Sequence, residues 1–468
     1  PKPVSATCAA DQLPRLPLPT GAKVIGLGDS AVRINHAAPS PTRISSLGIG
    51  QLVWARALDP RFTFDTWAVA RDAVDGRGFD GANQGLDGDH TVAVRGGVPG
   101  VLSRIPYVLA REPAIVYLQV GTNDINSHET AASVEQHLDQ IMKLLRAGHV
   151  WVVLSTIWPR ATAGGVAPWP AGDRRWQTRK AVNAWINAQR DRDGVRVVDA
   201  NPVLTDMAAP SGEEEWRPGY SSDGVHPAPP AAHSAAVAID AVLGDMIASG
   251  TTFATDPRIA NLIPDGTLTG TRGTASSGIV GAVADNWSAT LSGADGTVVR
   301  STVEASKEVI ENGLEKQVFV VRPRPVQGGD PNSDDTLTWA YAPDIGLAGT
   351  GVAEGDWIQA AVHADVSAWD AQRGISMTLL LRHGREAVMH EGSMRPFDPS
   401  RQHWPASAWN GWLLGEPVQI PPGANVDNIR TSVEVAFDDG ASDSGTVKFS
   451  RPIIRKVADP RRLWNLED

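Results

Sequence analysis

The segment KVIGLGDS, residues Lys23–Ser30, decides the fold of the first half of the chain. Its apolar part predicts a buried strand that ends at Gly28, and a serine follows almost at once. A serine at a strand-to-helix turn presents its hydroxyl at the edge of a sheet, where the N–H groups of the next helix favour negative charge. Gly28-Asp29-Ser30 alone also fits an ordinary helix N-cap, so other segments must decide between the two.

Outward from this segment, short apolar strands alternate with amphipathic helices up to about Gly250. The pattern predicts strands at Lys23–Leu27, Ala114–Val120, Val150–Thr156 and Val195–Val198, and helices at Thr130–Arg146, Asp173–Arg190 and Pro229–Ile247. Such alternation is typical of parallel strands that are joined by helical crossovers and covered on both faces. We therefore expect an α/β sandwich over residues 21–250, with residues 1–20 as an N-terminal extension.

The pattern changes near Gly250. Residues 251–264 lack periodicity and contain Pro257 and Pro264, so we expect a linker there. Residues 265–468 have turns rich in Gly, Thr and Ser between short strands, which we expect at Val318–Val321, Trp357–Val362, Ser376–Leu381, Ser432–Phe437 and Thr446–Phe449. This pattern predicts an all-β, jelly-roll-like sandwich as the second domain.

Length and charge agree with this division. A chain of 468 residues exceeds the size at which one core keeps growing, so two domains are expected. The net charge of −11 argues against nucleic acid as the main partner, because an acidic surface repels phosphate. The sequence has no apolar stretch long enough to predict a transmembrane segment.

Three further polar clusters lie in the α/β half: NQGLDG at Asn83–Gly88, GTND at Gly121–Asp124 and DGVHP at Asp223–Pro227. Glycines let backbone N–H groups approach a ligand, and an Asn amide can donate to an oxyanion. An Asp and a His three residues apart on one loop can both face Ser30. Taken singly, each cluster also fits a plain turn. In an open α/β sheet, all of them are expected near the carboxyl edge, where ligands bind.

In this order, the four clusters resemble the SGNH (GDSL-type) hydrolase family over Lys23–Gly250, about half of the chain. The resemblance implies a three-layer α/β/α, flavodoxin-like fold and a serine esterase that works through an acyl-enzyme. Ser30 would be the nucleophile, His226 the general base and Asp223 its partner. The chemistry implied needs no metal and no other cofactor.

The resemblance also implies an oxyanion hole made by the backbone N–H groups of Ser30 and Gly85 and by the side chain of Asn123. Ala31 follows Ser30 where the family often has Leu, which changes the wall of the pocket rather than the chemistry. Asp29, Trp158 and Trp216 fall near the expected site and are candidates for substrate contact, with core packing as the alternative for the tryptophans.

The segment from Leu262 is similar to the β-sandwich appended to some bacterial and phage SGNH-type hydrolases. This similarity implies a carbohydrate-binding domain, with Trp404, Trp409 and Trp412 as stacking platforms. The alternative is that these three residues fill the core of the sandwich. The implied location is secreted, periplasmic or phage-associated, and a cytoplasmic location is not excluded.

The leading hypothesis is an esterase that removes acetyl or other short acyl groups from a carbohydrate. Its expected partner is an acylated carbohydrate or another ester. The alternatives are an esterase for lipid, aryl or polyester substrates, a polysaccharide O-acetyltransferase, and a carbohydrate-binding protein on an inactive hydrolase fold. The sequence leaves open the acyl length, the sugar and the oligomeric state.

Overall fold

We describe the protein from a computed structural model. It describes residues 12–35, 43–46, 50–64, 83–86, 88–92, 100–161, 169–293, 299, 301–311, 313–324, 334–394, 404–438 and 440–465. Residues 1–11 of the expected N-terminal extension and Asp87 of the NQGLDG cluster lie outside this part. Within it, every helix is too short or too polar to cross a membrane.

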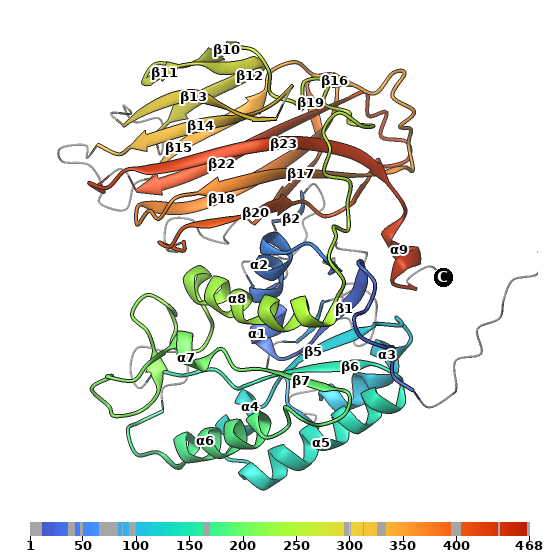
Figure 1. The fold of residues 1–468 in the computed structure, drawn as a ribbon, viewed down its shortest axis with the longest axis vertical. Helices are drawn as coiled ribbons and strands as arrows, with labels where there is room; N and C mark the ends of the chain where they lie inside the picture. The colour runs from blue at the N-terminus through green and yellow to red at the C-terminus, as the bar shows by residue number, and fades with distance from the viewer. Residues whose placement is uncertain are drawn as a thin grey trace, which may run out of the picture.

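The first half of the chain contains a parallel sheet with the strand order β3-β1-β5-β6-β7, and β4 also pairs with β1 (Figure 1). The strands are β1 (Ala22–Gly28), β3 (Phe62–Thr63), β4 (Asn83–Gly85), β5 (Ile115–Gln119), β6 (Trp151–Ser155) and β7 (Val195–Val198). The central strands β5 and β6 are buried along their whole length, as expected for a sheet covered on both faces. The predicted fold class of this half is confirmed.

Helices cover both faces of the sheet. Figure 1 shows α5 (Ala131–Ala147) and α6 (Arg174–Asn187) on the face away from the second domain, and α2 (Gln51–Leu58) and α8 (Pro229–Met246) on the face toward it. The shorter helices of this half are α1 (Ser30–Arg33), α3 (Ile105–Leu109), α4 (Thr122–Asn126) and α7 (Asn201–Leu204). The predicted helices correspond to α5, α6 and α8, whereas α2 was not predicted.

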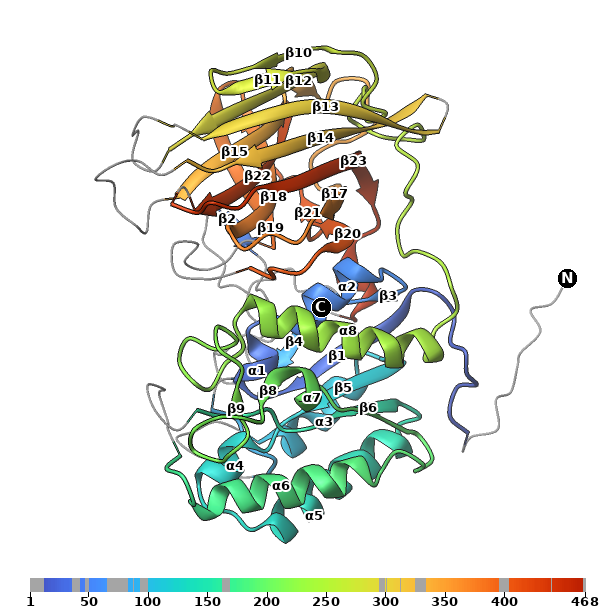
Figure 2. The same ribbon diagram turned by 60° about the vertical axis from the view of Figure 1, so that its left-hand side comes forward.

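The second half forms two stacked sheets, as predicted (Figure 2). One sheet contains β10 (Arg272–Ala275), β12 (Val283–Ser292), β15 (Asp334–Tyr341), β22 (Asn428–Asp438), β18 (Gln372–His383) and β19 (Glu386–Ser393), with β16 (Ile345–Gly346) beside β22. The other contains β11 (Ile279–Gly281), β13 (Thr302–Glu311), β14 (Leu314–Arg322), β23 (Gly445–Val457), β17 (Trp357–Val366) and β20 (Trp409–Leu414), with β21 (Val418–Gln419) beside β17.

Aromatic side chains fill the space between these sheets. Trp339 stacks on Trp287 at a ring-centroid distance of 4.0 Å and on Phe449 at 5.3 Å. Strand β15 alternates buried and half-buried residues, as a strand does when only one of its faces packs on a core. The alternation of small polar and large apolar residues in this half therefore sets which side of each strand faces inward.

The hypothesis that Trp404, Trp409 and Trp412 form stacking platforms for sugars is wrong, because these side chains are only 2%, 4% and 8% exposed. Trp404 and Trp409 both pack edge-on against Trp54 of α2 in the first domain. Trp412 packs against Phe253. They are buried, as the alternative of core packing requires, but against Trp54 of the first domain and Phe253 of the connecting segment as well as within the sandwich.

Each half of the chain also contributes a short segment that contacts the other half. Strand β2 (Arg43–Ser46) comes from the first half of the chain and pairs in parallel with β19 of the sandwich. After β23 the chain returns to the first half through α9 (Pro460–Leu463), where the Leu463 carbonyl accepts a 3.0 Å hydrogen bond from the Lys23 Nζ. The domains are therefore tied together at several places besides residues 251–264.

Candidate active site

The structure brings Ser30, His226 and Asp223 into one chain of hydrogen bonds. The Ser30 Oγ lies 2.7 Å from the His226 Nε2, and the His226 Nδ1 lies 2.6 Å from the Asp223 Oδ2. A neutral imidazole with its proton on Nδ1 satisfies both contacts, because it donates to the carboxylate and accepts from the hydroxyl. Ser30 and His226 are 196 positions apart in the sequence and are brought together by the fold: Ser30 follows β1 directly, and His226 lies in the loop just before α8.

The carboxylate of Asp223 is held by its own loop. Its Oδ1 accepts hydrogen bonds of 2.8 Å from the backbone N–H groups of both Val225 and His226. Burial alone would raise the pKa of Asp223, but the hydrogen bonds from the His226 side chain and from these two N–H groups outweigh it and lower the pKa well below its usual value. Asp223 is therefore ionised and fixed in orientation at neutral pH.

Ser30 is placed by the close packing of strand ends. Gly28 lies in register with Gly85 of β4 on one side and with Gln119 of β5 on the other. A Cβ atom at Gly28 would lie 1.9 Å from the Gln119 carbonyl oxygen, so only glycine permits this approach. The segments that carry Ser30 and Gly85 therefore end side by side, as the sequence motifs predict.

Asp29 is buried and caps the short helix that begins at Ser30. Its carboxylate accepts a 3.0 Å hydrogen bond from the Ala31 N–H, so it helps to fix the backbone next to Ser30. Burial raises the pKa of Asp29 to about 6, although the hydrogen bond from the Ala31 N–H and the nearby charge of Arg160 act in the opposite direction. Burial also lowers the pKa of Arg160, to about 10, which leaves its guanidinium charged near Asp29.

The expected oxyanion donors lie on neighbouring segments. Asn123 belongs to α4, which begins directly after Gly121, a residue with φ of 123°. Its Nδ2 donates a 2.9 Å hydrogen bond to the carbonyl of Asp89, and this contact fixes the direction of the carboxamide. Since an amide nitrogen carries two hydrogens, Asn123 has a second donor besides the one that Asp89 accepts. The carboxylate of its neighbour Asp124 accepts hydrogen bonds from the backbone N–H and the hydroxyl of Thr91, so it also contacts the segment that contains Asp89.

Arg104 supports these loops and was not found from the sequence. Its guanidinium donates to the carbonyl of Gly28 at 3.2 Å and to that of Gln84, and it forms an ion pair with Asp89. The side chains of Arg104 and Asp89 are 2% and 0% exposed. One buried cation thus ties together the backbone before Ser30, the backbone before Gly85 and the loop that Asn123 contacts. Its one sequence signal is a charged residue within the mostly apolar run Val101–Leu109.

A small pocket opens at Ser30. Its wall includes Val120, Ile157, Trp158 and Pro159 beside the polar atoms of Ser30 and His226. Trp158 therefore lies where the sequence placed it. Trp216 does not line this pocket; it packs edge-on against Trp158 at 6.0 Å and donates a 3.2 Å hydrogen bond to the carbonyl of Gly224.

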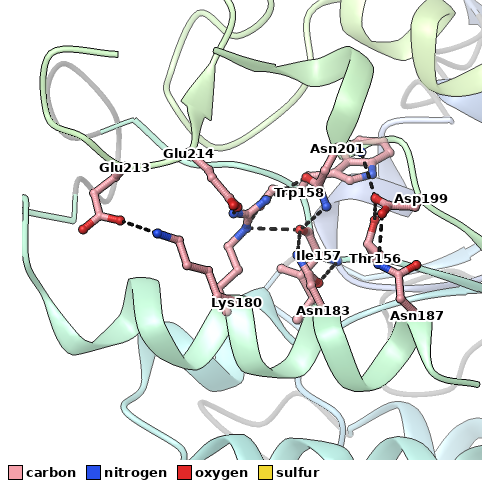
Figure 3. Close-up of polar contacts among 11 residues, drawn as sticks. Thr156, Ile157, Trp158, Lys180, Asn183, Asn187, Asp199, Asn201, Glu213 and Glu214 are labelled. Carbon is pink, nitrogen blue, oxygen red and sulfur yellow. Dashed lines mark hydrogen bonds and ion pairs between the residues drawn. The ribbon is translucent and has the colours of Figure 1, made fainter. Parts of the chain in front are cut away.

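The wall residues Ile157 and Trp158 are held by a buried network, which Figure 3 shows at the end of β6. Arg179 of α6 donates to the carbonyls of Ile157 at 3.1 Å and Trp158 at 2.7 Å, and it is paired with Glu214 at 2.6 Å. Asn183, one turn further along α6, bonds both the N–H and the carbonyl of Ile157. The backbone beside the pocket is thus fixed by the buried face of α6.

The first half of the chain is similar to known acyl hydrolases. The model of the GDSL-like lipase/acylhydrolase family matches residues 45–232, which contain Gly85, Asn123, Asp223 and His226, while Ser30 precedes the matched region. A comparison with curated proteins gave no match.

Several solved structures are similar over about half of this chain. A GDSL-like lipase from Bacteroides thetaiotaomicron is 18% identical, with 48% of this chain and 88% of that chain covered and a TM-score of 0.31. For an aryl esterase of M. smegmatis the corresponding values are 15%, 48%, 100% and 0.35. For a carbohydrate acetylesterase family member from Sinorhizobium meliloti they are 13%, 48%, 99% and 0.33. The family match supports a relation of the α/β half to the GDSL-like lipases and acylhydrolases, at the level of the family and not of a substrate.

Proposed function

We propose that this protein is a carboxylic ester hydrolase in which Ser30 is the nucleophile, His226 the general base and Asp223 the residue that orients it. The observation that carries the proposal is the continuous chain of contacts of 2.7 Å and 2.6 Å through the two nitrogens of His226. Nucleophile, base and orienting carboxylate in this arrangement are the parts that acyl transfer requires.

In the first step, the Ser30 Oγ attacks the ester carbonyl carbon while the His226 Nε2 accepts the hydroxyl proton. The tetrahedral oxyanion is stabilised by the N–H groups of Ser30 and Gly85 and by the Asn123 carboxamide. Its collapse breaks the bond to the alcohol, which leaves with the proton from His226. Water then attacks the acyl-enzyme with His226 again as base, and the acid and free Ser30 are released.

We propose a short acyl group, acetyl above all. Trp158 and Ile157 close the pocket at Ser30, and the network of Arg179 and Asn183 fixes their backbone. A long acyl chain would require these buried groups to move, whereas an acetyl group requires little space beyond the reacting carbon.

For the alcohol part of the ester, we propose a polyhydroxylated leaving group such as a sugar. A cleft lies between the domains and is lined by Tyr220, Ser234, Asp370 and Ser407 among others. Tyr220 belongs to the loop of the base, since its carbonyl accepts a 2.8 Å hydrogen bond from Ala228, just after His226. Hydroxyl and carboxylate groups of this kind can exchange hydrogen bonds with sugar hydroxyls.

The test is a substrate panel for the full chain and for Ser30→Ala. It compares acetate release from acetylated polysaccharides with hydrolysis of p-nitrophenyl acetate, butyrate and octanoate. We expect the acetylated glycans and the acetate ester to be hydrolysed, the octanoate ester to be poor, and Ser30→Ala to show only background. A preference for octanoate would replace the carbohydrate substrate by a lipid-like one. Sugar acetate formed from an activated acetyl donor would identify a transferase, and equal rates for Ser30→Ala and the wild type would refute the role of Ser30.

A further inference from the structure

Helix α2 lies between the α/β sheet and the β-sandwich, as both views show (Figures 1 and 2). Its residues from Gln51 to Ala57 are all buried, including the polar side chains of Gln51 and Arg56. A buried polar side chain needs a hydrogen-bonding partner. The partners of Gln51 lie in the first half of the chain, whereas Arg56 bonds the carbonyl of Phe64 in the first half and also reaches Leu414 and Glu416 in the second.

The first end of α2 contacts the segment of the nucleophile. The Gln51 Nε2 donates to the carbonyl of Ala31 at 3.1 Å and to the Gln119 Oε1 at 3.0 Å. Ala31 follows Ser30 directly, and the carbonyl of Gln119 accepts a 3.3 Å hydrogen bond from the Asp29 N–H. The Gln51 side chain therefore holds the backbone directly after Ser30, and it bonds the side chain of the residue whose carbonyl holds the backbone before Ser30.

Asn35 makes a second connection between the same two helices. Its Oδ1 accepts from the N–H groups of Leu52 at 2.8 Å and Val53 at 3.3 Å, while its Nδ2 donates to the carbonyl of Val32 at 2.8 Å. The residue before α2 is Gly50, which has no side chain to cap the helix, so Asn35 supplies the cap from outside it. A shift of α2 therefore moves α1, the helix that begins at Ser30.

The other end of α2 is held by the sandwich. The Arg56 Nη2 lies 3.0 Å from the Glu416 Oε1 and donates to the carbonyl of Leu414 at 3.3 Å. Both side chains of this ion pair are almost fully buried, at 2% and 0% exposure. Strand β20 comes so close that a Cβ atom at Gly411 would lie 2.3 Å from the carbonyl of Ala57.

We propose that α2 is the element through which the β-sandwich positions the nucleophile, and that the Arg56–Glu416 pair is its fixed point. The proposal rests on the proposed esterase function. It makes Gln51, Arg56 and Glu416 positioning residues that act on Ser30 through the backbone of Ala31. The sandwich is then a working part of the active site as well as a second domain.

The experiment is a double-mutant cycle on the full chain with Gln51→Leu, Glu416→Gln and the combined variant. The acylation rate of Ser30 is measured with a fluorophosphonate probe, and kcat and KM are measured with p-nitrophenyl acetate. We expect each single variant to lower kcat and the acylation rate about tenfold, because a small displacement of a reacting group is costly. KM should change little, since neither residue lies in the pocket, and the double variant should be no worse than Gln51→Leu.

Asp438→Asn is the matched control, because Asp438 forms an ion pair with Arg373 inside the sandwich and away from α2. It should lower the unfolding temperature at unchanged kcat. If Glu416→Gln does not fold, Arg56→Met/Glu416→Leu removes both charges at once, which buried pairs often tolerate. This variant should keep the unfolding temperature and still lose kcat.

Unchanged kcat in Glu416→Gln or in the paired variant, or losses that simply multiply in the combined variant, would overturn the coupling while the esterase function stands. A wild-type chain that neither hydrolyses the esters nor reacts with the fluorophosphonate would overturn the proposed function itself.

Discussion

The base and the nucleophile of the proposed triad are held in different ways. The loop of Asp223 and His226 is held mainly by itself: the contacts to the Asp223 carboxylate come from Val225 and His226, and the Ser221 Oγ donates a 2.6 Å hydrogen bond to the carbonyl of His226. The Trp216 contact to Gly224 spans only eight residues, although the same carbonyl also accepts a 3.1 Å hydrogen bond from the Ala161 N–H. This loop thus carries most of its geometry within one short stretch of sequence.

Ser30 depends on distant partners. Arg104, 76 residues away from Gly28, bonds its carbonyl, and Gln51 holds the carbonyl of Ala31 from a different helix. The helix of Gln51 is in turn fixed by Glu416, 360 residues from Arg56. A reactive hydroxyl held by long-range contacts is sensitive to changes that lie far from it, whereas the base loop is sensitive mainly to changes within itself.

The largest expected loss of activity comes from removing the side chain of either the proposed nucleophile or the proposed base. Ser30→Ala and His226→Ala should each lower kcat by about 10⁴–10⁶, and the double variant should be no slower than either, because the two act as a unit. Steady-state hydrolysis of p-nitrophenyl acetate checks this, with thermal unfolding as the control for folding. Independent, multiplying losses would mean that the two side chains do not act in one step.

A smaller effect is expected at Asn123, the proposed oxyanion donor. Asn123→Ala should lower kcat by about 10²–10³ with little change in KM, because its amide would act only when the oxyanion forms. Asn123→Asp keeps the size but replaces the donor with an acceptor and should be at least as slow. Full turnover in Asn123→Ala would remove this residue from the oxyanion hole.

The carboxylates of Asp223, in the proposed triad, and of Asp29, beside it, should affect stability with opposite pH dependence. Burial raises the pKa of Asp29 to about 6, so the folded state holds this proton more tightly and loses stability as the pH rises from about 4 to 6. Asp29→Asn keeps the cap and should raise the free energy of unfolding by about 1–3 kcal/mol above pH 6, with no gain below pH 4.

Asp223 has a lowered pKa, so its stabilising contribution is present above its unfolded value and is lost as the pH falls through its lower folded value. Asp223→Asn should therefore destabilise the protein at pH 7 and cost less in acid. Urea unfolding from pH 3 to 8 measures both variants. The same sign for both at pH 7 would contradict the contrast between the two sites.

The smallest expected change in kcat comes from a substitution that affects only the loop of Asp223 and His226. Trp216→Phe removes one hydrogen bond to the Gly224 carbonyl and should lower kcat by about two- to tenfold, the range for a single neutral bond. Trp176→Phe offers a control, since Trp176 donates to the carbonyl of Pro170 away from the site. Equal losses of kcat in both variants would mean that Trp216 acts through general stability.

Much of the fold and the central contacts of the site follow from the sequence. Strands such as Ala114–Val120 are visible because a buried parallel strand is continuously apolar, and the Asp223–His226 spacing encodes a local loop. The sequence order of the motifs also places Ser30, Gly85 and Asn123 at neighbouring strand ends. These features depend on short-range patterns, and short-range patterns are what a single sequence records.

The supporting residues do not follow from the sequence, for a physical reason. Helix α2 is short and buried on all sides, and Gly50 gives it no cap of its own, so neither a polar face nor a start signal marks it. Trp404 packs on Trp54 rather than facing solvent, and this depends on the residues that the fold places next to it. The residue type alone does not show which residues those are. Arg179 does leave a trace, because it occupies the same helical face as Trp176 and Ile186.

The contact of Gly411 with Ala57 bears on whether the two domains could be exchanged between related proteins. A catalytic half and a sandwich that met only through residues 251–264 could be exchanged freely between proteins by recombination at that segment. Here any side chain at position 411 would collide with the backbone of α2, and any new sandwich would also have to supply a carboxylate for Arg56. We therefore expect a chimera with a foreign sandwich to lose stability unless residues at the shared helix are substituted to match.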